Sequence, residues 1–154
     1  MTELLRVISD RILVKNDILI CRIEAPLYWW QGIEIFANGI TNLVFDSPEE
    51  IAKDELTLDD FSTDDMFERS IVSLESTLNI LNYYRSQYKE EDVESTASKK
   101  EYLQQIVKLL PSSYYVTGKL EIYMSTLRFI RRWYKDSPLK EWGEFFKCLE
   151  NIID

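Results

Sequence analysis

The sequence contains no histidine, and this absence excludes a good deal of chemistry. Without an imidazole there is no Ser-His or Cys-His nucleophile pair and no histidine-containing zinc site. Only four glycines occur, and none lies in a G-x-G-x-x-G or G-K-S/T loop that would cradle a phosphate. We therefore expect no catalytic residue, no metal site and no enzymatic activity.

Long hydrophobic runs and targeting signals are also missing. No apolar run reaches the roughly 18 residues that a membrane span needs. The start, MTELLRVISD, has no basic region followed by a long apolar stretch, as a secretory signal would. The two cysteines, Cys21 and Cys148, lie far apart, and such sparse usage suits a reducing cytosol. The sequence predicts a cytoplasmic protein with no membrane partner.

The composition indicates one folded domain over residues 1–154. The chain is 45% hydrophobic and 13% aromatic, which is enough to bury a sizeable core. It carries 27 acidic and 18 basic residues, a formal net charge of −9. Nucleic-acid binding depends on Lys and Arg contacts to phosphates, so this charge argues against direct binding of nucleic acid. Two readings remain: an ordinary acidic protein, or a protein whose partner is basic.

Hydrophobic periodicity and turn residues predict an α+β fold, mostly helical, with a few short strands and long packed helices. The expected strands cover 18–24 and 116–124, although a helix beginning at Thr117 competes with the second. The expected helices cover 3–14, 26–36, 62–89, 102–109, 125–134 and 139–149, with a short capped helix after Ser47. Polar loops are expected at about 46–61 and 90–99, and positive φ at Asn38-Gly39.

Capping and periodicity give these helices an expected start and face. Ser62 and Asp65 resemble a capping box for the helix over 62–89. Its expected core stripe is Phe67, Ile71, Leu74, Leu78, Leu81 and Tyr88. Pro26 is expected in the first turn of its helix, and Ser125 or Thr126 as the cap of the helix over 125–134. That helix should turn Leu127, Ile130 and either Trp133 or Tyr134 inward.

Acidic residues cluster in DSPEEIAKDELTLDDFSTDD, residues 46–65. Some of them could offer oxygen ligands to Ca²⁺ or Mg²⁺, but the segment lacks the D-x-D-x-D-G order and the distal glutamate of a calcium loop. Capping of helix N-termini and solvation are the favoured roles. As candidates for binding a basic partner we take Glu49, Glu50, Asp54, Glu55, Asp59, Asp60, Asp64 and Asp65.

One basic patch with interleaved aromatics occurs in RFIRRWYK, residues 128–135. On a helix, Arg128, Arg131, Arg132 and Lys135 cluster at i, i+3, i+4 and i+7. This face could bind phosphate or an acidic surface. Pairing with the chain's own acidic loops, or at a subunit interface of a homo-oligomer, is favoured because the chain has acids to spare.

Three stretches together suggest a relationship: DILICRIEAPLYWW (17–30), LTLDDFSTDD (56–65) and LLPSSYYVTGKLEIYMSTLRFIRRWYKDSPLKEWGEFFKCLE (109–150). In this order they resemble a family of small phage and prophage proteins that is distantly similar to flavin-dependent thymidylate synthases. The resemblance covers about two-thirds of the chain. It implies a fold of a few strands and long packed helices, shorter at the N-terminus than in full-length relatives, and tetramers that hold flavin and deoxyuridylate between subunits.

The residues that would hold these ligands do not match. The synthase signature R-H-R-x-x-S follows the segment that corresponds to APLYWW, where this chain has QGIEIFANGITNLVF without Arg or His. Framework positions match while ligand-holding positions do not, so no catalytic or cofactor-binding residue is carried over. If a pocket for a nucleotide or FAD survived, its residues would be Tyr28, Trp29, Trp30, Arg128, Arg131 and Arg132.

Three functional hypotheses follow. The leading one is a non-catalytic, phage-derived inhibitor of a basic host protein, such as a nucleic-acid-binding nuclease of a defence system; anti-CRISPR activity is the obvious case. The second is a nucleotide- or flavin-binding relative of the synthases, either an enzyme or a sponge for a signalling nucleotide. The third is a structural subunit of a phage assembly.

Overall fold

The computed structural model describes residues 6–7, 13–90 and 96–153. The chain divides into two compact units: one combines residues 1–45 with 115–154, and the other holds residues 46–114. That the two units act as one domain stays a prediction. An antiparallel sheet is combined with helices in an α+β fold, as predicted.

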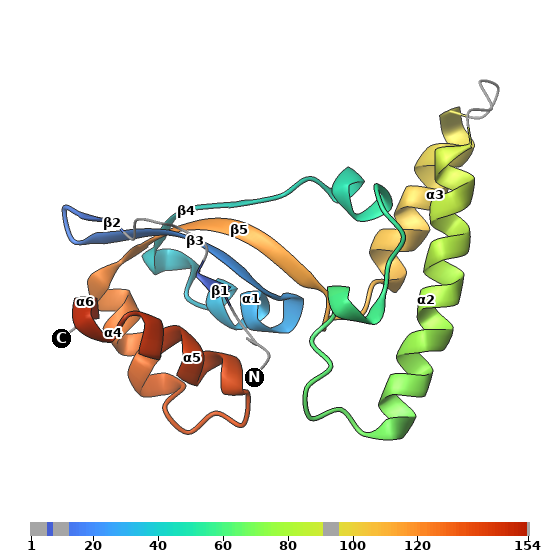
Figure 1. The fold of residues 1–154 in the computed structure, drawn as a ribbon. Coiled ribbons are helices and arrows are strands. Elements are labelled where there is room, and N and C mark those ends of the chain that lie inside the picture. The colour runs from blue at the N-terminus through green and yellow to red at the C-terminus, as the bar shows by residue number, and fades with distance from the viewer. Residues whose placement is uncertain (1–5, 8–12, 91–95, 154) are drawn as a thin grey trace. The chain divides into compact units, whose positions relative to one another are not determined.

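The first unit is an antiparallel β-sheet with helices on one face (Figure 1). The strand order is β1-β3-β5-β4, and β2 also pairs with β3. The strands are β1 (Arg6–Val7), β2 (Leu13–Lys15), β3 (Ile18–Pro26), β4 (Ile40–Phe45) and β5 (Tyr115–Tyr123). The unit's helices are α1 (Leu27–Glu34), η1 (Ala37–Gly39), α4 (Met124–Trp133), α5 (Lys140–Cys148) and α6 (Glu150–Ile153).

Side-chain alternation explains which sheet face is covered. In β3, Leu19, Cys21 and Ile23 are buried, and β5 buries Leu120 and Ile122 beside them. Cys21 pairs with Leu120, so the two long strands place their apolar rows on the same face. The rings of α1 and the apolar stripes of α4 and α5 join this core, which lies between sheet and helices.

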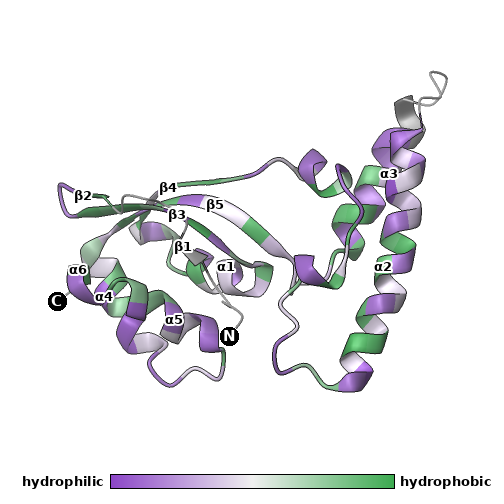
Figure 2. Ribbon diagram, viewed as in Figure 1, coloured by the Kyte–Doolittle hydropathy of each residue, from purple (hydrophilic) through white to green (hydrophobic). Residues whose placement is uncertain are grey.

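The second unit is helical. It consists of η2 (Pro48–Ala52), η3 (Leu58–Asp60), α2 (Glu68–Lys89) and α3 (Thr96–Leu109). Its core contains Leu74, Leu78 and Leu81 from α2 and Ile106 from α3, together with Ala52, Leu56 and Phe61 from the acidic segment. Figure 2 shows green, hydrophobic segments between purple, hydrophilic ones along α2 and α3. Within the described ranges, no helix combines the length and the apolar character needed to cross a membrane.

The N-terminal region differs most from the sequence prediction. The helix predicted over 3–14 is wrong at residues 6–7 and 13–14, which belong to β1 and β2; the remaining positions lie outside the described residues. Asn16 and Asp17 have φ angles of 55° and 62° and form the turn of a β2–β3 hairpin. Two positive φ values suit a two-residue hairpin turn, and Asn and Asp tolerate them well. The strand predicted over 18–24 is confirmed.

Other boundaries also shift. Pro26 ends β3 and caps α1 rather than lying in its first turn, and neither Asn38 nor Gly39 has a positive φ. The following strand, β4, was not predicted. The capping box at Ser62 is wrong, because α2 begins at Glu68. Phe67, predicted in the core stripe, is also wrong: it is the N-cap of α2 and is 83% exposed.

The C-terminal half of the chain shows smaller differences. The loop predicted over 90–99 is helical from Thr96, while residues 91–95 lie outside the described ranges. Thr117 lies in strand β5, so the strand predicted over 116–124 is confirmed and the competing helix is wrong. The α4 helix begins at Met124 with Tyr123 as its N-cap, so the caps predicted at Ser125 or Thr126 are wrong.

Candidate interaction surfaces

The aromatic stretch Tyr28-Trp29-Trp30 packs into the core of the first unit. Both tryptophan rings are buried, and they meet edge to face with centroids 5.0 Å apart. The Trp30 indole N–H donates to the Val116 carbonyl at 3.0 Å, and the Tyr28 hydroxyl donates to the buried carboxylate of Glu141. A fully buried ring has no face open to a base or a flavin, so the geometry gives a stacking site no support.

The three arginines proposed to hold phosphate lie along α4 on the outside of the same unit. The Arg128 guanidinium donates through Nε to the Ile153 carbonyl at 3.3 Å. Arg131 is half-buried, whereas Arg132 is exposed. Because Trp29 and Trp30 are enclosed by protein, the arginines and the rings do not line a common pocket.

An exposed aromatic patch lies beside these arginines. We define the aromatic patch as Ile35 and Phe36, which follow α1, with Phe129 and Trp133 of α4. Ile35 is 72% and Trp133 is 66% exposed. The Phe36 ring contacts the rings of Phe129 and Trp133 at 5.9 and 6.4 Å between centroids. Trp, Phe and Arg are the residues that anchor protein interfaces, so the patch has the composition of a binding surface.

Sequence reasoning recognised the basic and aromatic character of 128–135 but did not find the aromatic patch. Leu127, Ile130 and Tyr134 form the inward stripe of α4, with Leu127 and Ile130 fully buried. Phe129 and Trp133, four residues apart, therefore share the outward side. Ile35 could not be found this way, because its exposure depends on where α1 ends.

The acidic segment, residues 46–65, is folded rather than loose. Asn82 of α2 clamps its backbone, accepting from the Leu56 N–H at 2.8 Å and donating to the Leu56 carbonyl at 2.9 Å. Ala52, Leu56 and Phe61 are buried in the second core. The segment is thereby held in one conformation by apolar anchors spaced along it.

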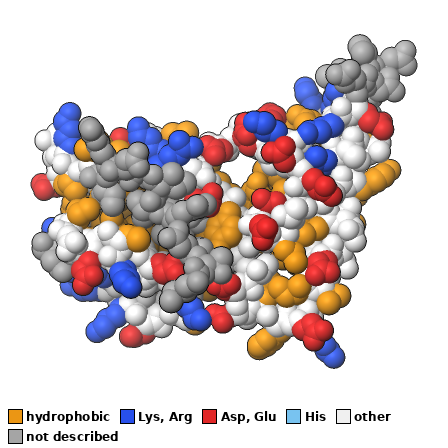
Figure 3. Space-filling model, viewed as in Figure 1, with side chains coloured by type: hydrophobic (Ala, Val, Ile, Leu, Met, Phe, Trp, Pro, Cys, Tyr) orange, Lys and Arg blue, Asp and Glu red, His pale blue; other side chains and the backbone are white. Residues whose placement is uncertain are grey.

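The carboxylates of this segment point outward from the anchors. Glu49, Glu50, Asp54, Glu55, Asp59, Asp64 and Asp65 are exposed and Asp60 is half-exposed. Figure 3 shows acidic side chains next to hydrophobic ones on this part of the surface. Two acids also serve local structure, as expected for helix N-termini. Asp60 accepts the Thr57 N–H at 2.8 Å, and a hydrogen bond from the Ser47 hydroxyl, with one from its own backbone N–H, lowers the pKa of Glu49.

The described residues contain no group of three or more His, Cys, Asp or Glu that could hold a metal ion. The acids of η2 and η3 are separated by buried anchors, which spreads their oxygens instead of converging them on one point. Dispersed carboxylates suit contacts with a broad basic surface better than chelation of one ion.

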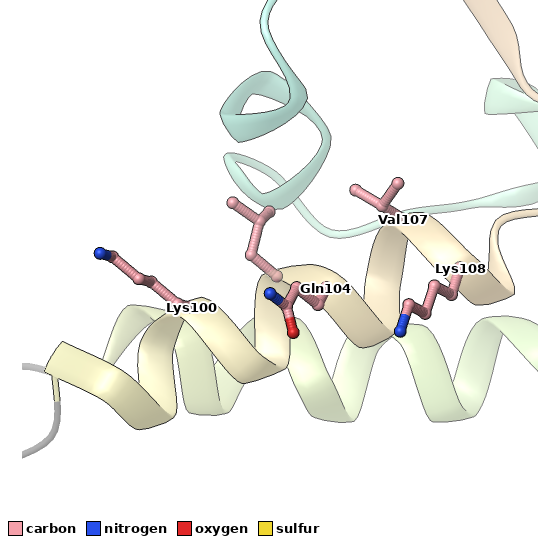
Figure 4. A pocket seen from close by; sticks show the side chains of 5 residues that line it. Lys100, Gln104, Val107 and Lys108 are labelled. Atoms are coloured by element: carbon pink, nitrogen blue, oxygen red, sulfur yellow. The ribbon is translucent and has the colours of Figure 1, made fainter.

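A hollow of about 350 Å³ opens on α3 (Figure 4). Its described lining residues belong to α3: Lys100, Leu103, Gln104, Val107 and Lys108. Leu103 and Val107 supply an apolar floor between two lysines. An open hollow of this kind lacks the convergent polar groups that orient a small ligand, so we assign no ligand to it.

The chain was compared with protein families, curated proteins and solved structures. No family model, no curated protein and no solved structure matches this chain. The acidic segment and the aromatic patch are the two candidate interaction surfaces.

Proposed function

We propose that this chain is a non-catalytic interaction protein that binds a basic, nucleic-acid-binding protein of a bacterial host and inhibits it. The observation that carries the proposal is the folded acidic segment, in which seven of eight candidate carboxylates are exposed around buried anchors. A surface of this kind offers a basic protein the charge that it normally finds on nucleic acid.

Pre-organisation strengthens this argument. A disordered acidic tail must be ordered on binding, which reduces its affinity. Here the Asn82 clamp and the buried Leu56 and Phe61 hold the backbone before any partner arrives. The net charge of −9 adds long-range attraction, which raises the association rate with a cationic target at low salt.

The resemblance to small phage proteins gives this function a biological setting. We propose an origin in a phage or prophage and a site of action in the cytoplasm of the infected or lysogenic cell, where anti-CRISPR activity is one form that the inhibition takes. Loss of the synthase signature is consistent with a framework reused for binding. No comparable structural observation supports the nucleotide-pocket hypothesis or the structural-subunit hypothesis.

Capture from a host lysate, followed by binding measurements with the purified partner, tests the proposal. In the test variant three exposed acids of the segment are neutralised: Glu50→Gln, Asp59→Asn and Asp64→Asn. In the matched control three exposed acids elsewhere are neutralised: Glu34→Gln, Asp136→Asn and Glu150→Gln.

We expect the test variant to bind roughly tenfold or more weakly at low salt, since three charged contacts are lost, while the control changes little. Affinity should fall steeply as salt is raised. A tight partner that is neither basic nor nucleic-acid-binding would overturn the proposal. If the test variant and the control variant lose affinity equally, the acidic segment is not part of the interface.

A further inference from the structure

The longest helix, α2, has apolar side chains on two opposite faces. Leu74, Leu78 and Leu81 are buried in the second core. On the opposite face, Val72, Ile80 and Tyr83 are between 45% and 58% exposed. Figure 2 shows the apolar segments along this helix. A surface helix with one partner has a single apolar stripe, so the second stripe of α2 indicates that a second surface covers it.

The outer face of α2 centres on Ser76. With 100° per residue, Val72 and Ile80 lie about 40° to either side of Ser76, and Arg69 and Tyr83 about 20°. Ser76 is small and exposed, and it lies midway between Val72 and Ile80 along the helix. A small residue at the centre of an apolar stripe allows another helix to approach closely.

Charge along α2 distinguishes it from the rest of the chain. The chain carries 27 acids, yet none occurs between Glu75 and Glu90, and Arg69 is the charged residue on the outer face. A basic partner would find no carboxylate there. A second copy of the same helix, in contrast, would meet no like charge at the centre of the contact.

We propose that the outer face of α2 binds α2 of a second copy of this chain, antiparallel, about a two-fold axis at Ser76. Such a dimer is isologous, so every contact occurs twice. Ser76 lies opposite its own copy, Val72 comes level with Ile80 of the second copy, and Arg69 comes level with Tyr83. The last pair brings a guanidinium within reach of an aromatic ring, an attractive combination.

This dimer goes beyond the proposed function and does not rest on it. The acidic segment packs on the side of α2 that bears Leu74 and Leu78, so the dimer contact leaves its carboxylates exposed. Each dimer then presents two acidic segments, which raises its avidity for a multivalent basic target. A contact made by one helix pair is small, so the dimer should dissociate on dilution.

Sedimentation velocity of the purified chain over a wide concentration range provides the first test. We expect reversible dimerisation that Ile80→Glu weakens at least about tenfold, because a carboxylate is placed in an apolar contact. The control, Val44→Glu, changes an exposed apolar residue of β4 in the other unit and should leave the dimer intact. Circular dichroism and thermal unfolding establish that each variant is folded.

Disulfide trapping tests the register with two serines of the same helix. In a Cys148→Ser background, Ser76→Cys should cross-link rapidly, since the two copies of position 76 face each other. Ser86 is also exposed on α2, ten residues further along. At about 1.5 Å per residue, two copies of position 86 would be about 30 Å apart in the antiparallel dimer, so Ser86→Cys should not cross-link.

Three results would overturn the dimer. The first is a monomer at the highest concentration reached, and the second is a dimer that Ile80→Glu leaves unchanged. The third is efficient cross-linking at both positions, which would require a parallel arrangement. All these readouts use the purified chain without a host partner, so their failure leaves the proposed function standing, and the reverse also holds.

Discussion

The ring of Tyr134 lies flat on the ring of Trp142, with centroids 3.9 Å apart and planes 5° apart. The Tyr134 hydroxyl also donates to the Gly32 carbonyl at 3.1 Å. One side chain therefore joins the end of α4 to α5 by stacking and to α1 by a hydrogen bond. This contact explains why Tyr134, and not Trp133, completes the inward stripe of α4.

Substitution of Tyr134 should separate these two contributions. Tyr134→Phe keeps the stack and removes the hydrogen bond, and we expect it to lower the free energy of unfolding by about 1 kcal/mol. Tyr134→Ala removes both and leaves Trp142 partly uncovered, with an expected loss of about 2 to 3 kcal/mol. Urea unfolding followed by circular dichroism measures both. Equal losses would mean that the stack contributes nothing.

Two glycines should respond to alanine in opposite directions. A Cβ atom at Gly39 would lie 2.6 Å from the Thr126 Cβ, so Gly39→Ala forces η1 and α4 apart. Overpacking of this kind typically costs about 1 to 3 kcal/mol. A Cβ at Gly143 meets nothing within 4 Å, and this residue lies within α5, where alanine is favoured by about 0.5 to 1 kcal/mol. Thermal unfolding of the two variants tests both expected changes in stability. Destabilisation by Gly143→Ala would contradict the structure.

The sequence was informative where one physical signal dominates. The β-branched run around Cys21 predicted β3, and the leucine spacing of α2 predicted its buried stripe. In each case local residue types and burial favour the same structure.

Prediction was wrong where a distant or competing contact decides. The apolar spacing of residues 3–14 suits a helix, but Leu13–Lys15 pairs with β3 through the Asn16-Asp17 turn. The β4 strand pairs with β5, about 75 residues later in the chain, and no local pattern contains that partner. The aromatic patch depends similarly on the meeting of α1 and α4. The acidic candidates could be named from composition, but their anchoring depends on Asn82.

Alkaline pH should destabilise the chain through Cys21. Burial raises the pKa of this thiol from 9.0 to about 12. The folded state therefore keeps the proton while the unfolded state loses it, and stability present below pH 9 falls as pH rises towards 12. Cys21→Ala should be less stable at neutral pH because it leaves a cavity, but its stability should fall less between pH 9 and 12. If the stability of Cys21→Ala and of the unsubstituted chain falls equally between pH 9 and 12, the Cys21 thiol is not the cause.

The neighbouring tryptophans should differ when each is replaced by phenylalanine. Trp30 loses a hydrogen bond to the Val116 carbonyl, whereas the buried Trp29 indole N–H has no hydrogen-bond partner among the residues that the structure describes. Both changes remove similar ring volume. We expect Trp30→Phe to be the more destabilising by about 1 kcal/mol, measured by urea unfolding. The reverse order would indicate that the Trp29 N–H finds a partner in solution, such as a buried water.

Trp133 should report on whatever covers the aromatic patch. The other three tryptophans are buried, so emission that acrylamide quenches in the folded chain should come from Trp133. Trp133→Phe should remove most of this quenching without lowering the melting temperature, since the ring is 66% exposed. Quenching that survives the substitution would show that a buried ring is accessible.

In a complex with the host partner, the quenching of Trp133 shows which of the two candidate surfaces, the aromatic patch or the acidic segment, the partner covers. Protection of Trp133 would place the aromatic patch in the interface, whereas unchanged quenching with salt-sensitive affinity would leave binding to the acidic segment, in the other unit.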